Sequence, residues 1–266
     1  MGLATQPDAY EQALRILRDE VLWHDLECGT YRGDLALWRE LAERHCGPVL
    51  EIGAGTGRVA LALAQSGQQV TALERDGALA GALRERVAGA AVDVVEHDAR
   101  SFELELREFA LCIVAMQTIQ LLGGAAARGA FLRRARLHLR DGGLLACAIL
   151  GPVEPFDCAA GGLGPEPEIA QVPGLLCVSA PVRVQVRRRA VVIERERRVF
   201  GGAHDHTGAA GPRAALARER AVIELDRLSE RGLRREAVAA GLQPQASRTI
   251  AATEDYAGST VVMLRA

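Results

Sequence analysis

The sequence predicts an α/β protein built on a doubly wound, mostly parallel sheet. Between residues 48 and 150, short apolar runs with the length of buried strands alternate with helical patterns, which is typical of repeated βα units. After residue 226 the order changes to a helix and two strands, joined by the short connector Asp255 to Gly258. Because so short a connector favours a hairpin, we expect the last two strands to be antiparallel.

The expected elements follow in chain order. Two helices, at 8–22 and about 33–45, have apolar residues at helical spacing. Strands are expected at 49–52, 69–73, 92–96 and 109–114, and residues 137–145 are expected to be a helix-end turn into a fifth strand. A helix from about 229 to 240 ends at Gly241, a suitable C-cap, and the hairpin strands are expected at about 243–252 and 259–265.

A different pattern separates the fifth strand from the last helix. Prolines and glycines between 152 and 173 predict a loop, and residues 182–186, 191–199 and 217–225 then alternate apolar and polar, as strands with one wet face do. That wet face is expected to carry Arg183, Arg187, Arg188, Arg189, Arg195, Arg197 and Arg198. Recognition of an anionic acceptor group is the alternative role of these arginines. We therefore divide the chain into N-terminal helices at 1–45, one domain formed by 46–150 and 226–266, and a small antiparallel β insertion at 151–225.

The turn between the first strand and the next helix carries the strongest functional signal. Gly53, Gly55 and Gly57 alternate there, and Glu51 precedes them on the strand. Glycine lets the backbone approach a ligand closely, and the free amides at the start of the helix add positive charge. Glu74 closes the following strand, where a carboxylate accepts both hydroxyls of a ribose. These residues predict a nucleoside site.

The glycine spacing resembles the first motif of the class I S-adenosylmethionine-dependent methyltransferases. A dinucleotide fingerprint has Gly-x-Gly-x-x-Gly, whereas Arg58 occupies the sixth position here. The resemblance runs from about Tyr31 to the C-terminus and implies a Rossmann-like, seven-stranded sheet with S-adenosyl-L-methionine as cofactor. It assigns the cofactor to Glu51, Gly53, Ala54, Gly55, Gly57, Arg58, Glu74, Arg75, Asp98, Ala99 and Met116.

Some of these roles are specific to the family. An acidic residue at the position of Asp98 accepts from the adenine amino group, and the neighbouring backbone amide, here that of Ala99, meets a ring nitrogen. Ala110 departs from the pattern, because the family usually has an Asp near the start of the fourth strand. The β insertion is similar to that of glycine and aminosugar N-methyltransferases, where it forms part of the acceptor pocket or a dimer face. A solvated, decorative sheet is the alternative.

The expected activity is methyl transfer to a small-molecule acceptor, at nitrogen rather than oxygen. Tyr31 matches a tyrosine-containing lid over the donor, and His24 stands where a tyrosine is common in that lid. Gln117 and Gln120 follow the fourth strand, close to where the methyl group is expected. Alternatively, His24 is a partly exposed histidine at a helix end, and Gln117 and Gln120 hydrogen-bond the backbone.

Two other functions stay open from the residues alone. The chain is alternatively a nucleoside-binding module without catalysis, or a nicotinamide-dependent oxidoreductase. The glycine spacing and the terminal hairpin count against the oxidoreductase.

Composition sets further expectations. A formal charge of −2 gives no electrostatic reason to expect nucleic acid, and the six scattered cysteines indicate neither disulfides nor a metal site. Without an apolar signal core or a membrane-length apolar run, we expect a cytoplasmic protein, and a homodimer stays open. Three groups are expected to have no catalytic role: the surface turn His204-Asp205-His206, a solvated His138, and the buried thiols of Cys112 and Cys147.

Overall fold

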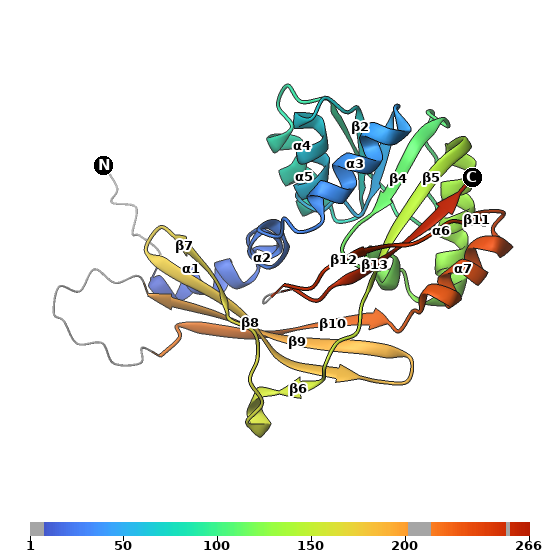
Figure 1. Ribbon diagram of the computed structural model, residues 1–266. Coiled ribbons are helices and arrows are strands. Elements are labelled where there is room, and N and C mark those ends of the chain that lie inside the picture. The colour runs from blue at the N-terminus through green and yellow to red at the C-terminus, as the bar shows by residue number, and fades with distance from the viewer. Residues whose placement is uncertain (1–7, 202–213, 254–255) are drawn as a thin grey trace. The chain divides into compact units, whose positions relative to one another are not determined.

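The computed structural model describes residues 8–201, 214–253 and 256–266 (Figure 1). These form two compact units. The β-extension unit takes residues up to 30, 154–186 and 192–223, and the parallel-sheet unit takes 31–153, 187–191 and 224–266. The helices before residue 30 and the helix after it thus belong to different units. The three-part division made from the sequence, with the roles assigned to its parts, stays a prediction.

The parallel-sheet unit contains the βα repeat. Its elements are α3 (Leu35–His45), β1 (Val49–Ile52), α4 (Arg58–Gln65), β2 (Val70–Glu74), α5 (Gly77–Arg86), β3 (Val92–Glu96), β4 (Phe109–Val114), the 3₁₀ helix η2 (Thr118–Leu121), α6 (Gly124–His138), β5 (Leu139–Leu150), α7 (Glu230–Ala239), β11 (Gln243–Pro244), β12 (Arg248–Ile250) and β13 (Ser259–Arg265). The sheet order is β11-β13-β5-β4-β1-β2-β3, with β12 also paired to β13. The five adjacent strands β5, β4, β1, β2 and β3 are parallel to one another, and β13 runs antiparallel to β5.

The predicted fold class is confirmed, with two local differences. Among the described residues the sheet has eight strands, because the first strand of the hairpin is interrupted between β11 and β12. There the Ser247 hydroxyl donates to Glu230 of α7, with 2.8 Å between the oxygens, and this side chain is directed away from the ladder. In the predicted helix-end turn at 137–145, Leu137 and His138 end α6 as expected, but β5 begins directly at Leu139 without an intervening turn. A register shift between β4 and β5 accommodates Gly142 there, at a φ of 74°.

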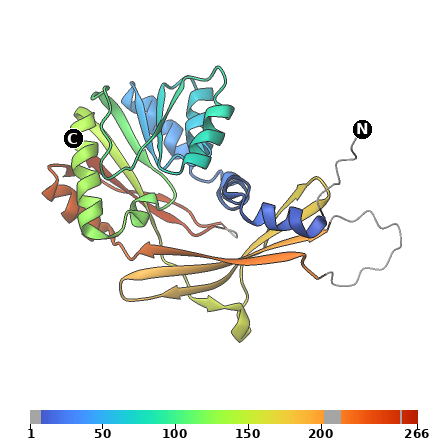
Figure 2. The same ribbon diagram turned by 180° about the vertical axis from the view of Figure 1, so that it is seen from behind.

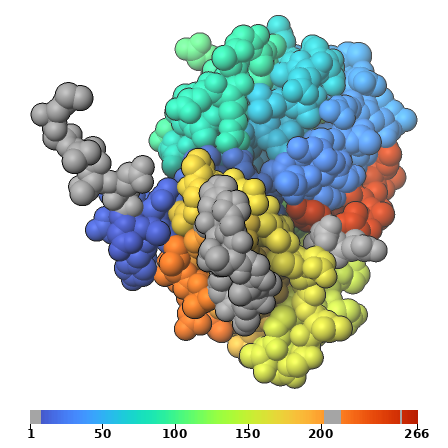
Figure 3. Space-filling model, turned by 90° about the vertical axis from the view of Figure 1, so that its left-hand side faces the viewer, coloured from blue at the N-terminus to red at the C-terminus, as the bar shows by residue number. Residues whose placement is uncertain are grey.

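Successive residues of the central strands build two cores, because their side chains point to opposite faces of the sheet. Val49 and Leu111 belong to the core covered by α3, α4 and α5 (Figure 1). Leu50 and Cys112 belong to the core covered by α6 and α7 on the other face, seen from behind in Figure 2. In the space-filling view, α3, α4 and α5 form adjoining bands from blue to teal (Figure 3). The burial predicted for Cys112 and Cys147 is confirmed.

His138 corrects the sequence prediction of a solvated histidine. Its side chain is fully buried at the end of α6. Nε2 accepts from the backbone N–H of Leu104 at 3.0 Å, and Nδ1 lies 2.8 Å from the carbonyl oxygen of Arg134. These partners imply a neutral ring with its proton on Nδ1. The basic residues of α6 suggested a solvated helix. The face of α6 that contains His138 is, however, covered by Phe102.

The β-extension unit contains a second sheet and the N-terminal helices. Its elements are α1 (Ala9–Leu17), α2 (Glu20–His24), the π-helix η1 (Asp25–Gly29), β6 (Phe156–Asp157), the 3₁₀ helix η3 (Cys158–Ala160), β7 (Glu168–Val172), β8 (Leu175–Val186), β9 (Ala190–Gly201) and β10 (Ala217–Asp226). The order is β10-β9-β8-β6, with β7 antiparallel to β8. Ala13, Leu17 and Trp23 of the helices pack against Cys177 and Val199 of the sheet.

Two predictions for this unit were incomplete. The helix expected at 8–22 is broken, because the Asp19 carboxylate accepts from the backbone N–H of Leu22 at 3.0 Å and starts α2 as a new helix. The proline-rich loop at 152–173 contains β6 and β7. His204, Asp205 and His206 lie outside the described residues. None of the described helices is long and apolar enough to cross a membrane.

Arg195 and Arg197 correct the prediction of a wet arginine face. Their side chains are 10% and 12% exposed, and both meet buried acids. Arg197 makes two hydrogen bonds to Glu27 of η1, at 2.8 and 2.9 Å, and Arg195 pairs with Glu168 of β7. Burial alone raises the pKa of Glu27, but the bond from Arg197 and the charges of both arginines outweigh it and lower that pKa. The alternation of apolar and polar residues correctly identified one face of β9. That face is covered by η1, so the side chains of Arg195 and Arg197 are largely buried.

Candidate functional site

The glycine turn after β1 needs glycine at each of its three positions. Gly53, Gly55 and Gly57 have φ values of 69°, 57° and 98°, in the region that side chains disfavour. A Cβ on Gly53 would lie 2.5 Å from a methyl of Thr118, and one on Gly57 would lie 2.2 Å from a methyl of Leu83. Gly57 is also the N-cap of α4. The turn is therefore held close to the loop after β4 on one side and to α5 on the other.

Glu74 at the end of β2 fastens this turn. One carboxylate oxygen accepts from the backbone N–H of Gly55 at 2.8 Å. The other accepts from the N–H groups of Arg75 and Asp76, at 2.7 and 2.8 Å. The predicted ribose acceptor thus touches the glycine turn itself, and its position is set by three backbone donors.

Asp98 follows β3 at the next strand end. The N–H of His97 donates to the carbonyl of Glu74 at 2.9 Å, so the two strand ends lie together. The Asp98 carboxylate accepts from the backbone N–H of Arg100 at 2.8 Å and pairs with its guanidinium at 2.5 Å. The hydrogen bonds from the Arg100 side chain lower the pKa of Asp98 to about 2. Asp98 is therefore a fixed anion, and the neighbouring Ala99 is buried.

Glu51 is the buried acid of the site, with only 2% of its surface exposed. Burial raises its pKa to about 8, although the charge of Arg58 and the amide of Ala60 oppose this. Within the described part of the chain, its Oε2 is a buried oxygen without a hydrogen-bond partner. An acceptor in that state requires either a proton or a cationic partner.

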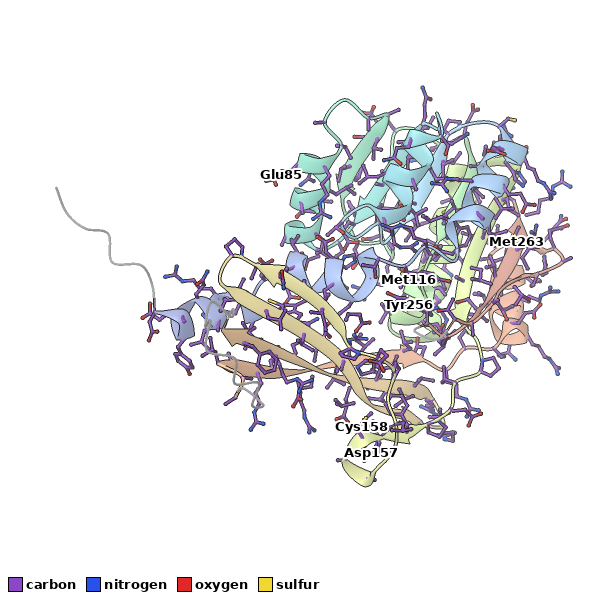
Figure 4. The ribbon with its side chains drawn as sticks, turned by 60° about the vertical axis from the view of Figure 1, so that its left-hand side comes forward. Glu85, Met116, Asp157, Cys158, Tyr256 and Met263 are labelled. Carbon is purple, nitrogen blue, oxygen red and sulfur yellow. The ribbon has the colours of Figure 1, made fainter. Side chains whose placement is uncertain are left out.

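The loop after β4 is strained where the methyl group was expected. Met116 and Gln117 have φ values of 42° and 61°, an unusual pair of non-glycine residues in the left-handed region. Strain of this kind persists where surrounding contacts enforce it, and it is common at functional sites. Here Gln117 Nε2 donates to Ser259 Oγ at 2.9 Å. Met116 and Tyr256 both pack against the core of the α3 face (Figure 4).

Tyr31 lies at the edge of the same core. Its side chain is 7% exposed, and its ring centroid is 4.6 Å from that of Tyr256 in the hairpin connector. Arg58, the first residue of α4, donates to the carbonyl oxygen of Tyr31 at 3.1 Å. Arg58 also makes two hydrogen bonds to Asp34, at 2.5 and 2.8 Å. The structure thus brings Tyr31 to the start of the glycine-turn helix.

The remaining candidates are divided. His24 lies in the β-extension unit, half-buried at the end of α2. Gln120 is buried and bonds backbone: its Nε2 donates to the carbonyl of Asp226 at 2.7 Å, and its Oε1 accepts from the N–H of Leu150 at 2.6 Å. No cluster of three possible metal ligands occurs in residues 8–201, 214–253 and 256–266.

Sequence reasoning missed four residues of this region: Asp34, Thr118, Tyr256 and Ser259. Asp34 directly precedes a helix, so the sequence alone suggests only an ordinary N-cap at this position. The other three have no motif of their own, since they reach the site only through the packing of the η2 loop and the hairpin.

Known proteins match this chain in its central segment and in its fold. A family model described as a methyltransferase domain matches residues 49–143. That segment begins at β1 and includes the glycine turn, Glu74 and Asp98. The central part of this chain is therefore similar to a methyltransferase domain.

A curated relative and two solved structures extend the comparison. An rRNA adenine N-6-methyltransferase of Corynebacterium diphtheriae is 37% identical over 65 residues, 24% of this chain and 26% of the relative. The chain thus matches only about a quarter of that protein's length. An amino pentose methyltransferase of Micromonospora echinaspora, involved in calicheamicin biosynthesis, is 22% identical over 100% of both chains, with a TM-score of 0.66.

The second solved structure is a sugar N-methyltransferase of a Streptoalloteichus species. It is 16% identical over 98% of this chain and 95% of its own, also with a TM-score of 0.66. At such identities these structures show a shared fold, and here that fold includes the β extension as well as the methyltransferase domain.

Proposed function

We propose that this chain is an enzyme that transfers a methyl group from S-adenosyl-L-methionine to a small molecule, at nitrogen. The observation that supports this most is the joining of the glycine turn to Glu74 through the Gly55 N–H, 2.8 Å from the carboxylate. The proposed ribose acceptor thus lies beside backbone with the positive φ that glycine favours. In the same domain, Glu51 offers a buried oxygen that has no hydrogen-bond partner among the described residues.

The residues of the domain fit the methyl donor. Glu74 would accept from the ribose, the fixed anion of Asp98 would accept from the adenine amino group, and Ala99 would meet the ring. Glu51 would receive the ammonium of the amino-acid end, since a cation stabilises a buried carboxylate. When bound, S-adenosylmethionine supplies a methyl group already activated on a sulfonium. The protein then has to align the acceptor and exclude water.

The side chains near the strained loop favour an amine acceptor. Gln117 bonds Ser259, and Tyr31 contacts Tyr256. None of these takes up a proton readily near neutral pH, and burial raises the pKa of Tyr31 further. A hydroxyl acceptor needs a base before it attacks, whereas a neutral amine attacks through its own lone pair. Tyr31 and Gln117 are proposed to orient the acceptor and shield the reacting atoms.

A small molecule is favoured over RNA as the acceptor. The rRNA methyltransferase matches only 65 residues. The aminosugar enzyme matches the whole chain, extension included. The formal charge of −2 is also unlike that of an RNA-binding protein. A role of residues 151–225 in the acceptor pocket or in a homodimer is part of this proposal, as is a cytoplasmic location.

Two measurements separate this proposal from its alternatives. Calorimetry should show binding of S-adenosylmethionine and of its demethylated product, S-adenosylhomocysteine, but not of NAD. Binding of NAD alone would instead support an oxidoreductase. A panel of aminosugars, other amines and hydroxylated analogues should then give methylated product with an amine. Donor binding without turnover on any acceptor would support the non-catalytic module.

A further inference from the structure

Arg58 is in an unexpected place for a cation. It is the first residue of α4, where the helix dipole already makes the helix end positive. Its side chain is also only 7% exposed. A buried guanidinium at a positive helix end is costly unless a well-placed anion compensates it. The anion that pairs with Arg58 therefore explains why this arginine is buried at the helix start.

Asp34 is that anion, and its geometry is unusual for its position. It is the N-cap residue of α3, where an aspartate ordinarily accepts from the backbone of its own helix. Here the side chain makes no capping bond. Both oxygens accept from Arg58 instead, and the Asp34 side chain is 2% exposed. The carboxylate is thus committed to a forked ion pair that joins the start of α3 to the start of α4.

The same guanidinium holds Tyr31. It donates to the Tyr31 carbonyl at 3.1 Å, and its central carbon lies 5.2 Å from the centroid of the Tyr31 ring. That distance is within the range of a cation–π contact. Tyr31 in turn stacks on Tyr256. One buried cation therefore sets the backbone and ring of Tyr31 beside the glycine turn.

We propose that Arg58 and Asp34 are positioning residues, which act on the methyl donor by fixing Tyr31 against the glycine turn. This rests on the function proposed above. It also changes the role assigned to Arg58 by resemblance, because a guanidinium with these partners serves residues 31–34 rather than the cofactor.

A double-mutant cycle tests the proposal against direct contact. The variants are Arg58→Met, Asp34→Asn and the double variant, and calorimetry measures their affinity for S-adenosylhomocysteine. We expect each single variant to lose about tenfold, and the double variant to lose little more, because either change breaks one unit. If Arg58 instead binds the ligand directly, Asp34→Asn will keep its affinity or bind more tightly, and the proposal fails.

Adenosine provides a second readout that general unfolding would not mimic. Its contacts are expected at Glu74 and Asp98, away from Tyr31, so the variants should bind adenosine as the unchanged protein does. An equal loss for adenosine would mean that the glycine turn itself has collapsed and would overturn a positioning role. Tyr31→Ala should add little to the loss in Arg58→Met, whereas independent, additive losses would contradict coupling through Tyr31.

Arg128→Met is the matched control. Arg128 is another 7%-exposed arginine of the same domain, paired with Asp226 and Glu236. Its loss should lower the melting temperature and leave S-adenosylhomocysteine affinity unchanged. A comparable loss of affinity in Arg128→Met would attribute the effect to general destabilisation and would refute the inference. Failure of the unchanged protein to bind S-adenosylhomocysteine would refute the proposed function instead.

Discussion

Replacement of Glu74 by alanine tests the centre of the site. The carboxylate accepts three backbone N–H groups, from Gly55, Arg75 and Asp76, all within 2.8 Å. Alanine removes the acceptor for all three donors and, in the proposed complex, for the ribose hydroxyls. We therefore expect weaker donor binding and a less stable turn at the same time.

The two magnitudes follow from those contacts. Lost charge-assisted bonds to the ribose are worth about 1.5–3 kcal/mol in all, which is about ten- to a hundredfold in affinity. Gly55 is buried, whereas Arg75 and Asp76 are exposed, so water replaces what the last two donors lose but not what Gly55 loses. We expect the unfolding free energy to fall by about 1–3 kcal/mol. In a domain of this size that lowers the melting temperature by about 2–4 °C per kcal/mol.

Calorimetry with S-adenosylhomocysteine and a thermal melt without ligand measure the two effects separately. Glu96→Ala is the matched control, because Glu96 is the register partner of Glu74 at the end of β3. Its side chain is 49% exposed and pairs with Arg84 at 3.4 Å. The control should change neither quantity. Unchanged affinity in Glu74→Ala would refute the ribose assignment. An unchanged melting temperature would show that the three backbone hydrogen bonds to Glu74 do not stabilise the turn.

Three further predictions concern buried groups. Because the pKa of Glu51 is about 8 in the folded protein and 4.5 ordinarily, the folded state keeps a proton that the unfolded state releases. Its contribution to stability should therefore fall from about pH 5 to pH 8, and Glu51→Gln should flatten that slope in denaturant titrations. Gly57→Ala should cost about 2–4 kcal/mol, from a positive φ and a 2.2 Å clash. His138→Phe should cost about 1–3 kcal/mol, since the N–H of Leu104 loses its acceptor.

Each has its own contradicting result. An equal pH slope in Glu51→Gln and the unchanged protein would show that Glu51 is ionised when folded. Gly67→Ala is the control for Gly57, because it has a φ of 82° but open space around its Cβ. Equal losses in both would remove the clash as a cause. A His138→Phe variant as stable as its parent would mean that the Leu104 amide bonds water.

The sheet was predictable because its signals are local. Apolar runs at 49–52 and 109–114 are long enough for buried strands, and both appear as β1 and β4. The glycines at 53, 55 and 57 were readable as a turn, and all three have positive φ. The break at Asp19 was not predicted, because residues 8–22 have the apolar spacing of one continuous helix. Only in the folded chain does the Asp19 carboxylate cap a new helix there.

The sequence by itself determined the order of the βα units, the glycine turn and the acids at the ends of β1, β2 and β3, because each depends on neighbouring residues. Tertiary structure alone decided which polar side chains are buried and with whom. Glu27 meets Arg197 across 170 positions, and Asp34 meets Arg58 across 24. Periodicity shows that a face exists, but a buried charge is stable only beside its partner, and only the folded chain selects that partner.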